Sequence, residues 1–505
     1  MGDHGVDLRF CIEVVSGQED AVIATHTAAP TQSGDAGDGP IDDCLSIRKG
    51  ILFVEGCAAT QLAERFGTPL YVMSEDQIRR NVRSFQAEFQ RGWPDGQVVV
   101  MPSIKANYGL ALRRILTEEG AGCDTFGAGE LQAALSTGVP PDLISFNGSS
   151  KTQQILIRAV AAGVRITLDS AREVELVIAA AAAAGRTARV RLRVRPDFDI
   201  DARSDFFSRP VSVRTASQMY KPGIPSENLA GAARDLLAAT GVELTGVMMH
   251  AGRHTTNLRV WSRIMQRFVE VIGWLRKATG GWEPHEIDIG GGFAVPRDPF
   301  GRSDRRRLKA AHAPSIAQYA RTITRTLREE LRRIGMSTAI RLEVEPGRSI
   351  YGNAGIHLAS VTNIKHQTTP VAYTWIETDT SDSFLPDVNL ERNRWSVYVA
   401  GRATDRPTMV ADVVGISCNF DVIVPAANLP EVRVGDTLAF IDTGAYQDAN
   451  ATNFNALPRP ATVLVTGKRS EIVKRAETID DVFARDVIPP RLAGAPHTAQ
   501  VSFGE

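Results

Sequence analysis

Cysteine is scarce in this sequence, and its few occurrences follow no motif. The five cysteines are Cys11, Cys44, Cys57, Cys123 and Cys418. Their odd number, their wide scatter and the absence of a CxxC pair predict neither a disulfide framework nor a zinc site. We therefore expect no bound metal. One of the five cysteines can still be catalytic.

The sequence also lacks an excess of charge and any long apolar run. Lysine and arginine number 57, aspartate and glutamate 58, and the formal net charge is -1. This balance argues against a nucleic acid or an anionic membrane as partner, because both attract strongly basic proteins. No apolar run approaches the about 20 residues of a membrane span, and the N-terminus has no basic segment followed by an apolar one. These absences predict a cytoplasmic protein.

The length of 505 residues exceeds one ordinary core and predicts two domains with an additional tail. Residues 1–48 include THTAAPTQSGDAGDGP, which can bury little surface, so we expect a partly disordered N-terminal extension. Between residues 75 and 350, apolar strands alternate with helical stretches, which predicts a parallel β/α barrel. Short β-rich segments punctuated by Gly, Pro and Asp predict a second, antiparallel domain from residues 50–74 and 351–490.

A lysine follows one of the predicted barrel strands. The segment 98–108 reads VVVMPSIKANY, an apolar run that ends in polar, turn-forming residues. Lys105 is therefore predicted at the C-terminal end of a buried strand, where β/α barrels place their chemistry. An amine held there can act as a nucleophile or as a Schiff-base partner. The alternative is a solvated lysine at the edge of a strand, which is the commoner case for such a residue taken alone.

Three other strands end in residues that suit an anionic or aromatic ligand. His250 ends the strand GVMMH, the run Gly290, Gly291 and Gly292 follows HEIDI, and Glu345 ends IRLEVE. Glycines at a strand end let backbone N–H groups approach a phosphate. A structural histidine, an ordinary glycine turn and a simple Pro-Gly turn are the corresponding alternatives. Together, the four strand ends suit a phosphorylated aromatic aldehyde.

At these motifs the sequence resembles the fold-type III pyridoxal-phosphate decarboxylases, most closely their diaminopimelate decarboxylase branch, with ornithine decarboxylase as a further relative. SIKAN is similar to YAVKAN, GCDTFGAGEL to GxDxxSxGEL, FNGSSKT to FxGxxKS and GVMMHAG to GLHxHxG, while DIGGGF and EPGRSI match outright. The resemblance covers roughly residues 50–473. It implies an alanine racemase-like fold, in which a TIM-like (β/α)8 barrel is joined to a C-terminal antiparallel β domain.

The resemblance also implies a cofactor, pyridoxal 5'-phosphate, and roles for individual residues. Lys105 would carry the cofactor, His250 would stack on its ring and Glu345 would contact the ring nitrogen. Further cofactor contacts are implied for Gly290, Gly291, Gly292, Gly347, Arg348 and Tyr446. Cys418 lies where the family has a catalytic cysteine donated by the neighbouring subunit, which implies a homodimer with shared active sites. The alternative for Cys418 is a buried structural thiol.

The substrate-binding motifs depart from the family. Candidate substrate contacts are Arg348, Leu385, Asn419 and Asp421. In the element similar to CESxD, Asn419 and Phe420 replace the glutamate and serine, and Leu385 stands in place of an arginine that holds a substrate carboxylate. Each lost charge-assisted hydrogen bond is worth about 1.5 to 3 kcal/mol. These changes predict a substrate other than diaminopimelate, unless Arg392 or Arg394 replaces the lost arginine.

We therefore predict a decarboxylase of an amino acid or amino-acid conjugate from a specialised pathway, working with pyridoxal phosphate. In this interpretation the cofactor ring accepts electrons as carbon dioxide leaves, and Cys418 returns a proton to the carbanion. One alternative is a racemase of the same fold, or a decarboxylase of an amino acid joined to a citrate or carrier arm. Another is a cofactor-binding regulator without catalysis, against which the presence of both Lys105 and Cys418 argues.

Overall fold

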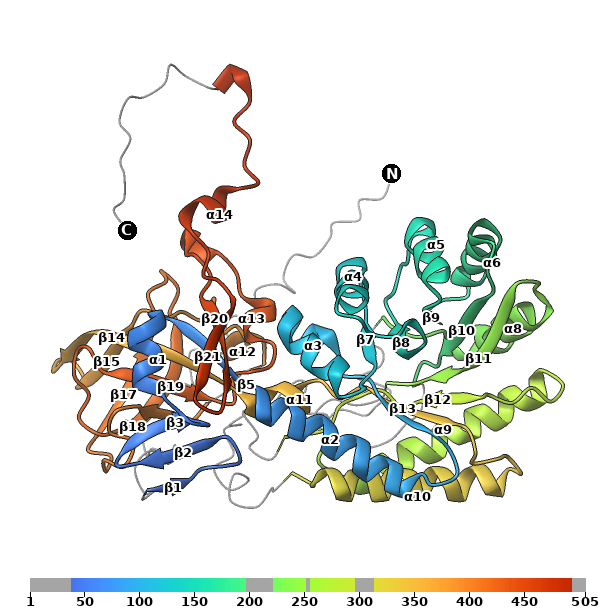
Figure 1. The fold of residues 1–505 in the computed structure, drawn as a ribbon, viewed down its shortest axis with the longest axis horizontal. Coiled ribbons are helices and arrows are strands. Elements are labelled where there is room, and N and C mark those ends of the chain that lie inside the picture. The colour runs from blue at the N-terminus through green and yellow to red at the C-terminus, as the bar shows by residue number, and fades with distance from the viewer. Residues whose placement is uncertain are drawn as a thin grey trace, which may run out of the picture.

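A computed structural model of the protein describes residues 38–196, 221–250, 255–295, 313–391, 393 and 395–492. Figure 1 shows a β/α barrel beside a second, β-rich domain. The barrel strands are parallel and follow the order β6-β13-β12-β11-β10-β9-β8-β7. An isolated parallel bridge between Ser103 and Asp124 brings the two ends of this sheet together. The strands are β6 (Val98–Val100), β7 (Cys123–Thr125), β8 (Ile144–Phe146), β9 (Arg165–Leu168), β10 (Ala188–Arg193), β11 (Val242–Met248), β12 (Glu286–Asp288) and β13 (Arg341–Val344).

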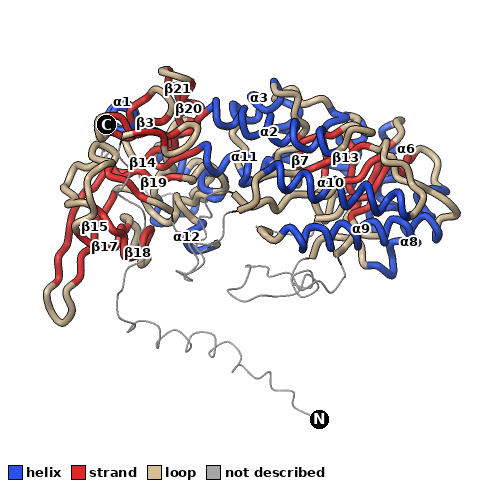
Figure 2. The backbone as a smooth tube through the Cα atoms, turned by 90° about the horizontal axis from the view of Figure 1, so that it is seen from below, coloured by secondary structure: helices blue, strands red, loops and turns tan. Residues whose placement is uncertain are grey.

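Helices surround the barrel strands on the outside, as Figure 2 shows from below. In α2 the apolar residues Ile78, Val82 and Phe85 recur at helical spacing and are all buried, and Ser74 caps the helix by accepting from the Gln77 N–H. The main barrel helices are α2 (Glu75–Gly92), α3 (Leu110–Glu118), α4 (Ala128–Ser136), α5 (Gln153–Ala162), α6 (Arg172–Ala184), α8 (Ser226–Ala238), α9 (Leu258–Ala278) and α10 (Ile316–Arg333). No described helix combines the length and apolar character needed to cross a membrane.

The second domain is built mainly from antiparallel strands. Its central strand, β14, pairs antiparallel with β5, β15 and β19, and β5 also pairs parallel with β20. The strands are β5 (Leu70–Ser74), β14 (Gly355–Gln367), β15 (Tyr373–Thr378), β16 (Val397–Val399), β17 (Met409–Val414), β18 (Val422–Leu429), β19 (Thr437–Ile441), β20 (Ala461–Thr466) and β21 (Arg469–Lys474). The predicted fold class, a parallel barrel joined to an antiparallel β domain, is confirmed.

A small antiparallel sheet begins earlier than the sequence suggested. It joins β1 (Gly39–Pro40), β2 (Leu45–Arg48), β3 (Ile51–Val54) and β4 (Cys57–Ala58), and α1 (Ala59–Phe66) follows. Leu45 and Ile47 alternate with polar residues along β2 and pack into the core of the second domain. The N-terminal extension expected to end at residue 48 therefore includes a strand of the folded domain, and residues 1–37 lie outside the described part.

His357, in β14, is a buried histidine of the second domain. It is fully buried, its Nε2 is 2.7 Å from the Thr380 hydroxyl, and its ring lies 4.8 Å from that of Tyr71. Burial lowers the pKa of His357 to about 3, whereas a histidine in an unfolded chain titrates near about 6.5. The unfolded chain therefore binds an additional proton between these pH values. This contribution to stability is complete above the unfolded pKa and is lost as the pH falls toward the folded one.

We expect the free energy of unfolding to fall by about 1.4 kcal/mol per pH unit between about pH 6 and pH 4 because of this residue. Chemical denaturation at a series of pH values measures it. His357→Gln can keep a hydrogen bond to Thr380 but does not titrate. For this variant, the plot of unfolding free energy against pH should lack the contribution of about 1.4 kcal/mol per pH unit. Parallel curves for the two proteins would show that His357 takes up its proton without unfolding.

Candidate active site

Lys105 lies five residues beyond the end of β6, on the short helix η3 (Ile104–Ala106), and half of its side chain is exposed. Its Nζ is 3.2 Å from Asp124 Oδ2, and Asp124 also accepts a hydrogen bond of 2.5 Å from the Ser103 hydroxyl. Desolvation acts to lower the pKa of the Lys105 ammonium, but Asp124, Tyr446 and Glu345 together raise it above its ordinary value. The amine is thus oriented by a carboxylate of the neighbouring strand, β7.

The side-chain amide of Asn147 links Glu345 to Asp124. Asn147 Nδ2 donates to Asp124 Oδ1 at 2.7 Å and to Glu345 Oε1. Glu345 is buried, and burial together with Asp124 and Asp288 raises its pKa well above the usual range, which Lys105 only partly offsets. Such a carboxyl becomes ionised most readily when a cation comes into contact with it. A protonated ring nitrogen would provide that cation.

The glycine run after β12 forms a tight loop between His250 and Glu345. Gly290 and Gly292 have φ angles of 67° and 101°, in the left-handed region that glycine tolerates. The Gly290 N–H donates to Asp288 Oδ1 at 2.8 Å, and the Gly291 N–H donates to His250 Nδ1 at 3.1 Å. A Cβ on Gly291 would lie 2.3 Å from the Glu345 carbonyl oxygen, so a larger residue does not fit.

Gly347, Arg348 and Tyr446 meet where the two domains join. The Tyr446 N–H donates to the Ala106 carbonyl at 2.7 Å, beside Lys105, and a Cβ on Gly347 would lie 2.9 Å from the Tyr446 hydroxyl oxygen. The Arg348 guanidinium lies over the Tyr446 ring at 4.7 Å and donates to Asp387 Oδ2 at 2.7 Å. Asp387 therefore balances the charge of Arg348 at this junction.

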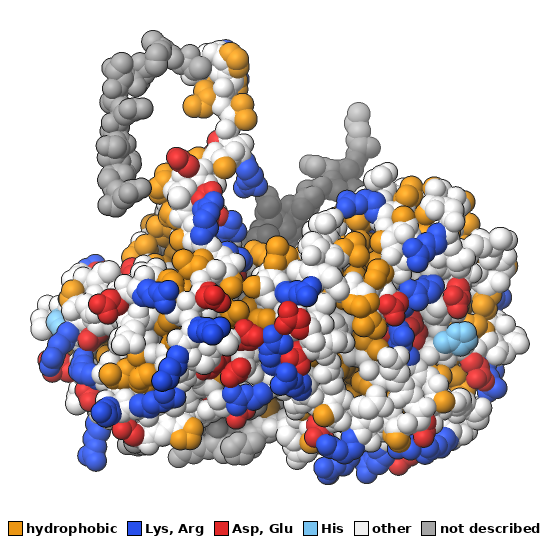
Figure 3. All heavy atoms as spheres, viewed as in Figure 1, with side chains coloured by type: hydrophobic (Ala, Val, Ile, Leu, Met, Phe, Trp, Pro, Cys, Tyr) orange, Lys and Arg blue, Asp and Glu red, His pale blue; other side chains and the backbone are white. Residues whose placement is uncertain are grey.

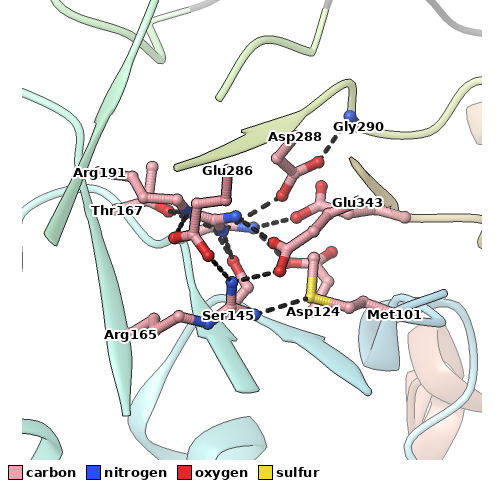
Figure 4. Close-up of polar contacts among 12 residues, drawn as sticks. Met101, Asp124, Ser145, Arg165, Thr167, Arg191, Glu286, Asp288, Gly290 and Glu343 are labelled. Carbon is pink, nitrogen blue, oxygen red and sulfur yellow. Dashed lines mark hydrogen bonds and ion pairs between the residues drawn. The ribbon is translucent and has the colours of Figure 1, made fainter. Parts of the chain in front are cut away.

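A network of buried charges fills the barrel interior below the glycine loop (Figure 4). Arg165 pairs with Glu286 at 2.5 Å and with Glu343, and Arg191 pairs with Glu343 and, at 3.2 Å, with Asp288. Burial opposes ionisation of Glu286, but Arg165 and Arg191 lower its pKa to about 2. Because Asp288 accepts from the Gly290 N–H, the network also supports the loop that carries the candidate phosphate contacts.

A second lysine near the site, Lys151, is not available for chemistry. It is buried, and its Nζ donates to the Thr167 carbonyl at 2.7 Å, to the Gly148 carbonyl and to Glu173 Oε2 at 3.1 Å. Burial lowers the pKa of Lys151 although Glu173 opposes the effect. All three ammonium protons are engaged, so Lys105 is the better candidate for carrying a cofactor.

Cys418 lies on an exposed loop between β17 and β18. Its N–H donates to Asn455 Oδ1 at 2.9 Å, and Asn455 Nδ2 donates to its Sγ at 3.4 Å. Asp421 is buried in the same loop and accepts from the backbone N–H groups of Ser417, at 2.7 Å, and Asp382, at 2.5 Å. These contacts fix the loop so that Cys418, Asn419 and Phe420 face outward.

Two residues that were expected to contact substrate, Leu385 and Asp421, are buried in the second domain. Leu385 is completely buried and packs in a core cluster of the second domain with Val388 and Trp395. Both carboxylate oxygens of Asp421 are used by backbone N–H groups. The structure thus shows roles in packing and loop formation for Leu385 and Asp421, and their contact with substrate stays a prediction. Arg392 and Arg394 lie outside the described residues.

The structure gathers Lys105, the glycine run, His250, Glu345 and Tyr446 around the C-terminal ends of β6, β12 and β13. Four further side chains take part in the site, although their sequence positions alone predict no role for them: Asp124, Asn147, Asp387 and Asn455. Asp124 and Asn147 stand inside the motifs GCDTFGAGEL and FNGSSKT, and Asn455 ends DTGAYQDANATNFN. The signal was therefore present in the sequence, whereas the partners of these side chains required the fold.

These residues fit pyridoxal phosphate. The half-exposed Lys105 amine is accessible, the glycine loop leaves no room for a Cβ beside Glu345, and the buried Glu345 carboxyl lacks full charge compensation. When bound, the group would supply a conjugated ring that accepts an electron pair. Lys105, the glycine run and Glu345 would hold it.

Similarity to known proteins identifies the family of this chain. Residues 75–352 match the family model of the pyridoxal-dependent decarboxylases, pyridoxal binding domain. The diaminopimelate decarboxylase of Methanocaldococcus jannaschii is 30% identical over 89% of this chain and 98% of its own, and that of Pseudomonas aeruginosa is 30% identical over 89% and 100%. A crystal structure of the M. jannaschii enzyme with L-lysine superposes with a TM-score of 0.80, at 29% identity, over 89% of this chain and 99% of that chain. The chain therefore belongs to the pyridoxal-dependent decarboxylase family, and its cofactor, pyridoxal 5'-phosphate, and its reaction class, amino-acid decarboxylation, follow from this membership.

Proposed function

We propose that this enzyme decarboxylates an amino acid, or an amino-acid conjugate, whose side chain differs from that of diaminopimelate. The proposal rests on the composition of the loop that contains Cys418. There Asn419 and Phe420 occupy the positions of a glutamate and a serine in the resembling motif, and Phe420 is 97% exposed. An apolar ring in place of a hydroxyl suits a neutral or acylated substrate end better than a charged one.

The chain's own residues have five roles in this proposal. Lys105 would hold the cofactor, and Asp124 orients the Lys105 amine. Glu345 would stabilise positive charge on the ring nitrogen, and His250 would contact the ring. The cofactor would supply the electron sink for decarboxylation. Cys418 Sγ would hold the proton that is returned to the substrate carbon.

We further propose that two copies of the chain complete each other's sites. Cys418 is exposed, and among the described residues its hydrogen bonds run to Asn455 alone. A thiol that delivers a proton to a carbanion needs a site shielded from water, because bulk water would otherwise compete for the reaction. A second copy can supply that shielding together with its own Lys105.

A subunit-exchange experiment tests the shared site. Lys105→Ala and Cys418→Ala proteins are each expected to be nearly inactive, and mixing them should restore about a quarter of native activity. With random exchange in a two-fold dimer, about half of the dimers are mixed, and each mixed dimer has one intact site. Activity is measured after exchange has been verified with differently tagged subunits. Absence of recovery despite exchange would place both residues in one subunit's site.

A substrate screen tests the reaction itself. Purified enzyme is supplied with amino acids and their N-acyl, citryl and other conjugates, and carbon dioxide release is followed together with cofactor absorbance. The proposal expects release from at least one neutral or acylated substrate. Inversion of the α-carbon without carbon dioxide would instead indicate a racemase, and a change in absorbance without product would indicate a binding protein.

A further inference from the structure

A groove lined mainly by arginine lies on the outside of the barrel, between α2 and α10, which Figures 1 and 2 show side by side. Its cavity volume is 360 Å³, and sites for small ligands have volumes of roughly 300 to 1,000 Å³. Figure 3 shows lysine and arginine side chains gathered along the lower edge of the barrel, where α10 lies. The residues that line the groove are Glu88, Arg91, Gly92, Ala317, Arg321, Thr324, Arg325, Arg328, Glu329 and Arg332. The groove thus offers five guanidinium groups to a ligand.

Four of these arginines recur on one face of α10. Arg321, Arg325, Arg328 and Arg332 follow one another at spacings of four, three and four residues, which aligns them along the helix. Like charges three or four residues apart repel each other and destabilise an isolated helix. A solvated helix face usually alternates charges of both signs. This run of a single sign is therefore better explained by a negatively charged ligand than by solvation alone.

The ion pairs of the groove lie at its edges. Glu88 pairs with Arg91, and Asp95 lies 3.5 Å from Arg328 and 3.3 Å from Arg332. The Nε atom of Arg328 is nevertheless buried without a hydrogen-bond partner among the described residues. A buried N–H that lacks an acceptor is costly. An acceptor oxygen of a ligand in the groove would let the Arg328 guanidinium satisfy it.

The middle of the groove has uncompensated positive charge. Arg321 and Arg325 are exposed and have no ion-pair partner in the part of the chain that the structure describes. Five arginines face three carboxylates, those of Glu88, Asp95 and Glu329, which leaves an excess of two positive charges. Guanidinium groups bind phosphate through two parallel hydrogen bonds, and each phosphate brings about 1.5 to 2 negative charges. The excess therefore suits a ligand with linked phosphates better than one with a single carboxylate.

The floor of the groove forms where α2 and α10 come closest. A Cβ on Gly92 would lie 2.3 Å from Thr324 Oγ1, and the buried Thr324 hydroxyl donates to the Ala320 carbonyl at 2.6 Å. The missing side chain at Gly92 thus lets the two helices meet while the arginines form the walls. No lining residue belongs to the candidate active site, since Lys105 and Glu345 follow barrel strands.

A nucleic acid fits this groove less well than a small phosphate compound. None of the described lining residues is aromatic, so unpaired bases would find no ring to stack on. The chain as a whole has a net charge of -1, which disfavours a long polyanion that extends past the groove.

We propose that the groove between α2 and α10 binds a small compound with two or more linked phosphates, which is either an inorganic polyphosphate or a nucleoside di- or triphosphate. Arg321 and Arg325 bind the phosphates in the middle of the groove, and Arg328 binds them toward the end where Asp95 lies. The inference is independent of the proposed substrate and of the proposed shared site.

The test titrates inorganic triphosphate into the full-length holoenzyme by isothermal titration calorimetry. The cofactor occupies the glycine loop in the holoenzyme, so the probe cannot bind there, and an unchanged cofactor absorbance confirms this. We expect saturable binding at one site per chain. Combining Arg321→Glu with Arg325→Glu should raise the dissociation constant at least about thirty-fold, because two charge-assisted contacts become repulsive.

The matched control combines Arg158→Glu with Arg172→Glu. These arginines are also exposed, lie on α5 and α6, and give the same change in net charge far from the groove (Figure 1). Because salt screens distant surface charges, the control should alter the dissociation constant by less than about two-fold. Equal weakening in both double variants would show that the probe responds to overall charge and would overturn the inference.

ADP, ATP and a single-stranded RNA oligonucleotide are titrated in the same way to identify the source of the phosphates. Equal affinities for triphosphate and ATP would show that the groove recognises the phosphates alone, and tighter binding of ADP or ATP would show that the nucleoside contributes; both results support the proposal. Native holoenzyme that binds neither triphosphate nor ATP, or that binds the oligonucleotide more tightly than either, would overturn it.

Discussion

Lys105→Ala is expected to lower turnover at least about a thousand-fold, which corresponds to about 4 kcal/mol in the barrier. The reason is chemical, because the half-exposed Lys105 amine beside Asp124 is the group that can bond to the cofactor aldehyde. The purified native protein should be yellow. Borohydride reduction followed by peptide mass spectrometry should find the cofactor attached to Lys105 and to no residue of the variant.

Lys105→Arg is the matched control for charge. Arginine keeps a cation next to Asp124 but cannot form the bond, so this variant should also lose covalent attachment while folding as the native protein does. Cofactor bound to Lys151 in either variant would refute the assignment. The geometry argues against that outcome, because all three protons of the Lys151 ammonium are donated to neighbouring oxygens.

The second large effect concerns substrate choice. We expect meso-diaminopimelate to be turned over at least about a hundred-fold less efficiently than the true substrate, which is about 2.7 kcal/mol of lost transition-state binding. Its distal amino and carboxylate groups would have to leave water beside Phe420 and Asn419, where the resembling motif has a serine and a glutamate. Comparison of kcat/KM for the two substrates measures this.

The matched variant combines Asn419→Glu with Phe420→Ser. It restores the charge and the hydroxyl of the resembling motif and should raise kcat/KM for diaminopimelate about ten-fold or more, while activity with the native substrate falls. Since both side chains are exposed on a loop fixed by Asp421 and Asn455, the change should leave the fold intact. Efficient use of diaminopimelate by the native enzyme would contradict the proposal and indicate that Arg392 or Arg394 supplies the missing contact.

Strand ends were the part of the site that the sequence predicted well. Lys105, Gly290 to Gly292 and Glu345 each follow a run of apolar residues, and the parallel barrel brings all such ends to one face. The sequence could not predict which polar groups would meet there. Asn147 bridges Asp124 and Glu345 because β7, β8 and β13 approach within the closed barrel, and that relation depends on three separate strands.

Leu385 shows that a motif match alone does not reveal the surroundings of a side chain. A motif alignment places it at a substrate-binding position, but an apolar side chain turns toward whatever core is available, and here it packs beside Trp395. The proposed shared site could be predicted neither from motifs nor from the fold of one chain, since a single chain presents Cys418 on its surface whether the residue is catalytic or not. That question is decided by a second copy.

The paired arginines and glutamates inside the barrel have a consequence for how this scaffold can change. Glu343 bonds to Arg165 and to Arg191, Arg165 also bonds to Glu286, and Arg191 to Asp288, so losing one member leaves the remaining buried charges with fewer counterions. Breaking such a pair is far more harmful than exchanging all of it for apolar residues. In evolution or in design, these positions should therefore change together. Joint replacement of all the charged residues by apolar ones is tolerated better than a single substitution, which gives an unstable protein.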